Sequence, residues 1–216
     1  MKRIGLIFDV DGTLWDASEE VAAAWDEVVY QEVGRHITKK DLMKTMGLPM
    51  TSIADRLFPD FEEKERIVLL NKSTENELVY LSKHPGKLYP EEEKTLLALK
   101  EEGFRLGILS NAQPGYIEIL LESTGLGYLF DDHICWGDNR FPKSKNMRIL
   151  QERNKWDEIL YVGDTAMDED ESDKAGVKFI HASYGFGKAS HPFFTLRTFK
   201  DLLSLKSLLQ KEESLL

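Results

Sequence analysis

Four short apolar segments, none of which alternates apolar with polar residues, constrain the fold of this chain most. They span residues 3–8, 105–109, 158–162 and 177–180. A strand that is apolar at successive positions is buried on both faces, as in a parallel sheet covered by helices on each side. Helical segments lie between them, and Pro90 and Pro114 each start a helix that a glycine ends. The pattern predicts a doubly wound (Rossmann-like) α/β fold with a parallel sheet.

Residues 16–84 have a different pattern, with no convincing strand. Val21, Trp25, Val28 and Val29 form one helical stripe, and a second amphipathic helix is expected over about residues 62–82. A block of helices inserted after the first strand predicts a separate all-α cap domain. The expected division is therefore a core of residues 1–15 and 85–216 and a cap of residues 16–84.

Charge and cysteine content exclude several classes of partner and compartment. Of the 216 residues, 38 are acidic and 28 are basic, so the formal net charge is −10. This balance disfavours nucleic acid or an anionic membrane as the main partner, because both select basic surfaces. No segment approaches the roughly 20 apolar residues of a membrane helix. Cys135 is the only cysteine, so no intrachain disulfide forms, and we expect a cytoplasmic monomer or homodimer.

Polar residues follow three of the expected strands. Asp9 and Asp11 follow the first, Ser110 and Asn111 the second, and Asp164 the third. Ligands of open parallel sheets bind outside the carboxyl ends of the strands, so these side chains are expected at one edge. Asp9 and Asp11 face one point if the chain stays extended. Two carboxylates are tolerated there if a hard divalent cation lies between them, or if one keeps its proton.

Four motifs occur in an order that identifies a family. They are DVDGT at 9–13, LSN at 109–111, a lysine at 143 and GDTAMD at 163–168. The chain resembles phosphatases of the haloacid dehalogenase superfamily that carry an inserted helical cap, and it is similar to phosphoglycolate phosphatase-type hydrolases. The first motif is specific and the order and spacing of the set strengthen it. The resemblance covers essentially the whole chain, with the cap as its least constrained part.

The resemblance implies a role for each acid. Asp9 would be the nucleophile that forms an aspartyl phosphate, and Asp11 would be the general acid and base. Mg²⁺ would be held by the Asp9 carboxylate, the Asp11 backbone carbonyl and the Asp164 carboxylate. Thr13 and Asp168 would support these groups without ligating the metal directly.

The resemblance also implies how the phosphate is bound. Ser110 and the backbone around Asn111 would donate hydrogen bonds to the phosphoryl oxygens, and Lys143 would neutralise charge on the phosphate and on Asp9. Lys145 competes with Lys143 for this role. Lys143 is preferred because PKSKN resembles the K-x-x-N form of the family at a typical distance before GDTAMD.

The expected function is Mg²⁺-dependent hydrolysis of a small phosphorylated metabolite. MGLPM at 46–50 resembles the cap loop that approaches the leaving group, although the ester itself stays open. Three alternatives are carried. A dehalogenase would use Asp9 against carbon without metal, which Asp11 and the GDTAMD acids argue against. A phosphomutase resembling β-phosphoglucomutase would keep the same site, and a non-catalytic phosphometabolite-binding regulator would be expected to lack one of the acids.

Overall fold

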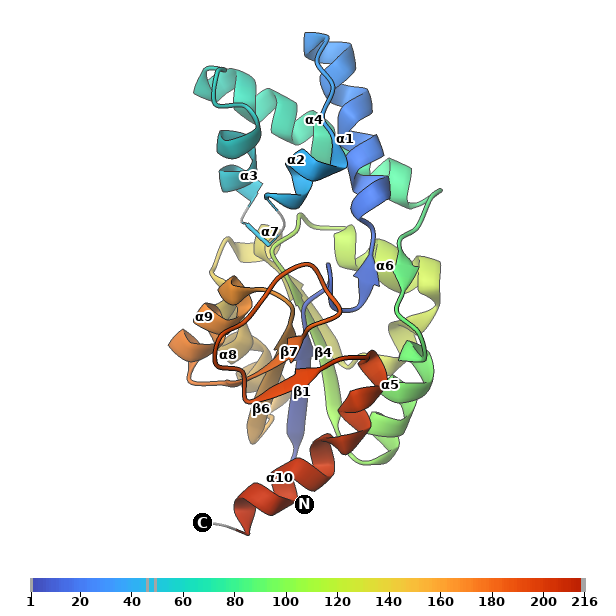
Figure 1. Ribbon diagram of the computed structural model, residues 1–216, viewed down its shortest axis with the longest axis vertical. Helices are drawn as coiled ribbons and strands as arrows, with labels where there is room; N and C mark the ends of the chain where they lie inside the picture. The colour runs from blue at the N-terminus through green and yellow to red at the C-terminus, as the bar shows by residue number, and fades with distance from the viewer. Residues whose placement is uncertain (1, 46, 49, 215–216) are drawn as a thin grey trace.

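A six-stranded parallel sheet forms the centre of the molecule, in a computed structural model that describes residues 2–45, 47–48 and 50–214. The strand order is β5-β4-β1-β6-β7-β8, and every neighbouring pair is parallel. The strands are β1 (Ile4–Phe8), β4 (Arg105–Ser110), β5 (Asp132–Cys135), β6 (Glu158–Gly163), β7 (Lys178–Ala182) and β8 (Phe194–Leu196). β1 therefore lies inside the sheet, between β4 and β6, and its carboxyl end reaches the middle of the sheet edge (Figure 1).

Helices cover both faces of this sheet. One face carries α5 (Glu92–Glu101), α6 (Tyr116–Thr124), the 3₁₀ helices η1 (Leu126–Leu129) and η2 (Phe199–Ser204), and α10 (Leu205–Glu213). The opposite face carries α8 (Lys143–Asn154) and α9 (Ala166–Ala175). Successive side chains of β1 enter different apolar clusters, with Leu6 and Phe8 in one and Ile7 in the other. This burial on both faces is the reason for the unbroken apolar runs, and the predicted doubly wound fold is confirmed.

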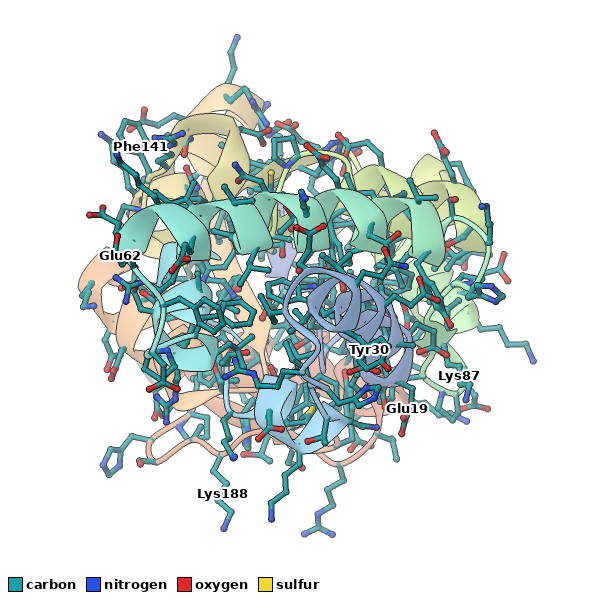
Figure 2. The ribbon with its side chains drawn as sticks, turned by 90° about the horizontal axis from the view of Figure 1, so that it is seen from above. Glu19, Tyr30, Glu62, Lys87, Phe141 and Lys188 are labelled. Carbon is teal, nitrogen blue, oxygen red and sulfur yellow. The ribbon has the colours of Figure 1, made fainter. Side chains whose placement is uncertain are left out.

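Four helices gather beyond the carboxyl ends of the strands (Figure 1). They are α1 (Ser18–Val33), α2 (Lys39–Met43), α3 (Met50–Leu57) and α4 (Glu63–Leu81). α1 and α4 pack along one another, α2 packs on α1, and α3 packs on α4. Seen from above, α4 crosses the top of the molecule from the Glu62 end, beside the part of α1 that carries Tyr30 (Figure 2). The unit thus lies over the edge of the sheet where the polar residues of the sequence were expected.

A two-stranded antiparallel ribbon joins the four helices to the sheet. β2 (Trp15–Asp16) precedes α1, β3 (Lys87–Leu88) follows α4, and Trp15 pairs with Leu88. Both passages of the chain between the units therefore lie side by side. The division into a core and a cap domain at residues 15/16 and 84/85 stays a prediction and is taken up below.

Several short elements were not predicted from the sequence. β5 begins with Asp132 and His133, and β8 has only three residues at the sheet edge, so neither has a long apolar run. The short helix α7 (Trp136–Asn139) was also missed, because four residues are too few to show a helical period. Among the helices that the structure describes, none combines the length and apolarity that crossing a bilayer requires.

Glu92 is a buried carboxyl at the start of α5, where the chain re-enters the core after the ribbon. Its side chain is 2% exposed. Oε2 accepts a hydrogen bond from the Tyr89 backbone N–H at 3.2 Å, and Oε1 has no partner among the described residues. Burial raises the pKa of Glu92 to about 9, and the hydrogen bond from Tyr89 opposes this only in part.

Replacing Glu92 by glutamine should make the stability of the protein less dependent on pH. Between the usual glutamate pKa and about 9, the unfolded chain releases a proton that the folded chain retains, so the wild type loses stability as pH rises. We expect the free energy of unfolding of Glu92→Gln, relative to wild type, to rise by about 1–3 kcal/mol between pH 5 and pH 8 in urea titrations. Glu101→Gln, at an exposed position of α5, should change the free energy of unfolding by the same amount at pH 5 and at pH 8. If the free energies of unfolding of the two variants changed with pH in the same way, this account of Glu92 would be wrong.

Candidate active site

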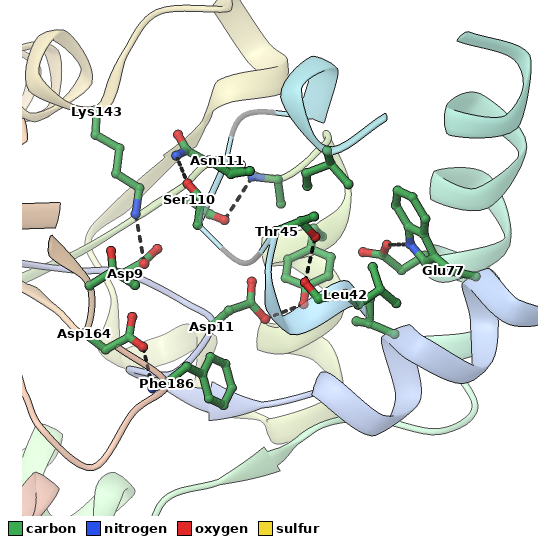
Figure 3. Close-up of a pocket in the computed structure, with 18 residues that line it drawn as sticks. Asp9, Asp11, Leu42, Thr45, Glu77, Ser110, Asn111, Lys143, Asp164 and Phe186 are labelled. Carbon is green, nitrogen blue, oxygen red and sulfur yellow. Dashed lines mark hydrogen bonds and ion pairs between the residues drawn. The ribbon is translucent and has the colours of Figure 1, made fainter. Parts of the chain in front are cut away.

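The three strands in the middle of the sheet bring their polar residues to one cavity. Asp9 comes directly after β1, Ser110 ends β4, and Asp164 comes directly after β6. All three are buried, and they line a cavity together with Asp11 and Lys143 (Figure 3). The parallel arrangement places the ends of neighbouring strands at the same level, as in other open α/β sheets that bind ligands at this edge.

Lys143 connects two of the buried acids. Its Nζ lies 2.9 Å from Asp9 Oδ2 and 2.6 Å from Asp168 Oδ1, and its side chain is 4% exposed. Lys145 instead lies at the surface, with Nζ 3.3 Å from the centre of the Phe141 ring. Of the two lysines considered from the sequence, Lys143 is therefore the one that lies in the cavity.

Asp168 is the ionised partner of Lys143. Its oxygens accept hydrogen bonds from the Thr165 hydroxyl at 2.6 Å, the Thr165 N–H at 3.0 Å and the Tyr161 hydroxyl at 3.3 Å. Burial alone would raise the pKa of Asp168, but the Lys143 ammonium and these donors hold it below its ordinary value. Burial likewise opposes the charge on Lys143, yet Asp168 and Asp9 raise its pKa above the usual value, so the ammonium persists.

Asp9 and Asp164 are buried carboxyl groups whose ionised forms Lys143 stabilises only in part. Burial raises the pKa of Asp9 well above its usual range, and the carboxylates of Asp168 and Asp164 add to this against the attraction of Lys143. Burial, followed by repulsion from Asp168, raises the pKa of Asp164 to about 7. Asp164 Oδ2 accepts a hydrogen bond from the Phe186 N–H at 2.7 Å, whereas Oδ1 is buried without a partner in the described part of the chain.

These oxygens fit a hard divalent cation. One carboxylate oxygen from each of Asp9, Asp164 and Asp168 lies within 4.8 Å of the other two. Those of Asp168 are already engaged by Lys143 and Thr165, which leaves Asp9 and the unpartnered Asp164 Oδ1 as the available ligand atoms. An oxygen-only donor set with excess negative charge suits Mg²⁺ or Ca²⁺.

Asp11 accepts a hydrogen bond from a tyrosine in the helix that follows β4. The hydroxyl of Tyr116, at the start of α6, donates a 2.7 Å hydrogen bond to Asp11 Oδ1. Burial raises the pKa of Asp11 to about 6, and the Tyr116 hydrogen bond opposes the shift. Sequence reasoning missed Tyr116, because its position reads as an ordinary buried residue of an amphipathic helix.

The residues expected to bind phosphate face the same cavity. Ser110 Oγ accepts a hydrogen bond from the Ala112 N–H at 3.1 Å, which leaves the hydroxyl proton free to point into the cavity. The Asn111 side chain has a different partner, since Nδ2 donates to the Gly47 carbonyl at 2.7 Å. Gly47 belongs to the loop predicted to approach the site at residues 46–50. Met46 and Pro49 of that loop lie outside the described residues, and Gly47 and Leu48 line the cavity.

Thr13 follows Asp11 in the chain, and the loop at residues 183–187 packs against Asp164. Thr13 is fully buried, but its hydroxyl has no hydrogen-bond partner among the described residues, so its supporting role stays a prediction. Gly185 allows the loop to pack directly on Asp164, because a Cβ there would lie 2.4 Å from the Asp164 Cβ.

Gly12 turns the chain after Asp11 with φ at +76°, and a Cβ there would lie 2.3 Å from Asp164 Oδ2. The Gly12→Ala substitution should therefore displace Asp164 and weaken Mg²⁺ binding. Gly34→Ala is the matched control, since Gly34 has φ at +66° but nothing within 4 Å of its Cβ position. Both variants should lose stability by about 1–2 kcal/mol from backbone strain. If Mg²⁺ binds at Asp164, it should raise the melting temperature of the wild type and of Gly34→Ala but not of Gly12→Ala. Loss of this increase in both variants or in neither would contradict the expected contact.

Comparison with known proteins places this site in a family. A family model described as haloacid dehalogenase-like hydrolase matches residues 6–182. A phosphoglycolate phosphatase from Aquifex aeolicus is 29% identical over 211 residues, which cover 93% of this chain and 95% of the relative. One from Salmonella typhimurium is 27% identical over 234 residues, covering 92% and 90%.

Solved structures share the fold at lower identity. A haloacid dehalogenase-like family hydrolase from Streptococcus pneumoniae superposes with a TM-score of 0.82 at 16% identity, covering 94% of this chain and 98% of the other. CbbY from Rhodobacter sphaeroides, solved in complex with phosphate, gives 0.77 at 17% identity, covering 92% and 95%. The family match spans most of the chain and includes the strands that carry Asp9, Ser110 and Asp164. The chain therefore belongs to the haloacid dehalogenase-like hydrolases, and it is an enzyme of that family.

Proposed function

We propose that this enzyme is a Mg²⁺-dependent phosphatase that hydrolyses a small phosphomonoester through an aspartyl phosphate. The observation that carries the proposal is the position of Asp9, buried at the end of β1 between the Lys143 ammonium and the unpartnered oxygen of Asp164. The relatives named above are phosphoglycolate phosphatases, and a structural neighbour was solved with phosphate bound. Both support a phosphorylated metabolite as substrate.

Asp9 is the proposed nucleophile. Its carboxylate oxygen would attack phosphorus, forming the Asp9–phosphorus bond as the bond to the leaving oxygen breaks. Mg²⁺, held by the carboxylates of Asp9 and Asp164 and by the Asp11 backbone carbonyl, would supply the positive charge that Asp9 and the phosphate need to lie together. Lys143 and the Ser110 hydroxyl would bind the phosphoryl oxygens, in a buried setting where such interactions are strong.

Asp11 is the proposed general acid and base. It would give its proton to the leaving alkoxide, so that the alcohol departs neutral, and then take a proton from the water that attacks the phosphorus. That second attack breaks the Asp9–phosphorus bond and releases inorganic phosphate. The raised pKa of Asp11 favours the protonated form needed first, and Tyr116 holds its carboxyl toward the cavity.

The helices α1–α4 are the proposed cap, with residues 16–84 as the cap and residues 1–15 and 85–216 as the core. Side chains from this unit, including Val21, Trp25 and Leu42, form the side of the cavity that faces the acids. Their apolar character would keep bulk water away from the phosphoryl group during transfer. The β2–β3 ribbon is the proposed hinge, because both chain passages run through it.

Phosphate release from a panel of small phosphomonoesters tests the function. Wild type should turn over at least one ester with Mg²⁺ and none with excess EDTA, and Asp9→Asn should reduce kcat by at least about 10³-fold because the nucleophile is lost. Asp173→Asn, at an exposed position of α9, should match wild type. Mg²⁺ should also raise the melting temperature of wild type but not of Asp164→Asn. If isomerised ester accumulates in place of phosphate, the enzyme is a phosphomutase.

The two lysines provide a matched pair for the phosphate-binding role. Lys143→Met keeps the volume but removes the charge that faces Asp9 and the phosphate, so kcat/KM should fall by about 10²-fold or more. Lys145→Met changes a surface residue that contacts Phe141 and should stay within about twofold of wild type. Comparable losses in both variants would sink the assignment of Lys143.

A further inference from the structure

Glu77 is a buried acid in the cavity that the proposed chemistry does not use. It lies on the cap helix α4, and its side chain is 3% exposed. In Figure 3 it lies on the opposite side of the cavity from Lys143, with Asp11 and Thr45 between them in that view. Because Lys143 marks the phosphate end, Glu77 marks the end that a leaving group would occupy.

Two donors hold Glu77 in place. The Trp25 indole N–H, from α1, donates to Oε2. The Gln113 side-chain amide donates to Oε1 at 3.1 Å, and Gln113 lies in the loop that follows β4 of the core. Both partners are donors, which suits a carboxylate that accepts hydrogen bonds. Burial nevertheless raises the pKa of Glu77 to about 7, and the two hydrogen bonds only partly oppose the shift. A further donor from a ligand would therefore meet an incompletely compensated carboxylate.

The rest of this end of the cavity is almost entirely apolar. The cap side chains that line it, apart from Glu77 and the hydroxyl of Thr45, are Val21, Trp25, Leu42, Leu48 and Ile53. Thr45 already donates its hydroxyl proton to the Leu42 carbonyl at 2.7 Å. Glu77 is thus the strongest hydrogen-bonding group that the described cap residues present to a leaving group.

Positive charge is missing where a leaving-group carboxylate would lie. Lys143 is the only cationic side chain among the described residues that line the cavity, and it is already paired with Asp9 and Asp168. A ligand carboxylate beside Glu77 would face a like charge unless one of the two groups took up a proton, whereas a neutral or cationic donor needs no added proton.

A neighbouring hollow contains cations, but it belongs to the core surface. It shares Asn111 and Lys143 with the cavity and adds Arg140 and Lys174. Lys174 is 2.6 Å from Glu171, which also lines the hollow. Within the described chain, no residue of α1–α4 lines it, so a group bound there would not be enclosed by the proposed cap.

The size of the cavity restricts the leaving group further. About 60 Å³ of it is open to the centres of water-sized spheres. One water needs roughly 10–15 Å³ on this measure, so the cavity has room for a few waters. The phosphoryl group would take part of this space, so the leaving group can have only a few non-hydrogen atoms.

We infer, building on the proposed phosphatase activity, that the Glu77 end of the cavity binds a small leaving group that is uncharged or cationic and donates a hydrogen bond to Glu77. The substrate class is then a hydroxyalkyl or aminoalkyl phosphate, not a carboxyalkyl phosphate. This chain would accordingly differ in substrate from the phosphoglycolate phosphatases that it resembles.

Four two-carbon esters test this inference on the full-length enzyme with saturating Mg²⁺. They carry the same phosphate and differ only at the far carbon: phosphoglycolate, 2-hydroxyethyl phosphate, 2-aminoethyl phosphate and ethyl phosphate. For wild type we expect kcat/KM for the hydroxyethyl or aminoethyl ester to exceed that for phosphoglycolate by at least about tenfold. The better of these two esters identifies whether an alcohol or an ammonium group is the preferred donor.

Substitutions of Glu77 and Arg140 then test which side chain determines the preference among the esters. Glu77→Gln keeps the shape of the side chain but removes its charge. The ratio of kcat/KM for the preferred ester to that for phosphoglycolate should therefore fall by about tenfold, while kcat/KM for ethyl phosphate should change by less than about threefold. Glu77→Asp should restore part of the preference. Arg140→Gln, in the neighbouring hollow, should leave the ranking of the esters unchanged.

If phosphoglycolate is the best of the four esters for the wild type, the inference is overturned but the proposed phosphatase activity stands. If the rate of phosphoglycolate hydrolysis then falls in Arg140→Gln, the substrate carboxylate lies in the neighbouring hollow. Unchanged discrimination in a folded Glu77→Gln would also overturn it. Hydrolysis of none of the four esters, with Mg²⁺ still raising the melting temperature, would overturn the proposed function as well, which separates the two failures. The wild-type ranking needs no variant, so it decides the matter even if Glu77→Gln does not fold.

Discussion

The ammonium group of Lys143, placed between Asp9 and Asp168, is the interaction on which the rest of the site depends. Both distances are within 3 Å and all three side chains are buried. A buried ion pair is retained only when its remaining hydrogen bonds are satisfied, and Thr165 and Tyr161 satisfy those of Asp168. Asp168 can therefore stay ionised and hold Lys143 against Asp9. The geometry around the proposed nucleophile is fixed from the α8–α9 face of the sheet before any ligand arrives.

The single positive charge of Lys143 cannot balance all the acids gathered at this edge of the sheet. Asp164 and Asp11 have raised pKa values because burial removes water from their carboxyl groups, and Asp164 also faces Asp168. Such crowding costs stability in the protein alone. The proposed divalent cation would relieve this repulsion when it binds together with a phosphate. The fold supports this arrangement because three parallel strands end at one level and the helices on both faces keep them in register.

The two units contribute different parts of the cavity. The core supplies the charged groups of the proposed phosphate site, and the described residues of α1–α4 supply apolar walls with one acid, Glu77. Among the described residues, side-chain hydrogen bonds cross between them from Asn111 to the Gly47 carbonyl and from Gln113 to Glu77. Both core donors lie in the loop after β4, next to Ser110. The proposed phosphate site and the proposed leaving-group site are thus physically adjacent, although their residues belong to separate segments of the chain.

The sequence by itself determined the sheet, its burial on both faces and the carboxylates at its edge, because apolar runs and polar strand ends are local patterns. The short strands β5 and β8 escaped, since neither has a long apolar run. The motif favoured Lys143 over Lys145 only by resemblance. The two lysines lie about 200° apart around a helix, so the packing of α8 was needed to show that Lys143 is the one that enters the cavity. The tertiary structure also brought Tyr116 to Asp11 and Glu77 to Gln113. These partners are 105 and 36 residues apart, and at such separations no local period relates one side chain to the other.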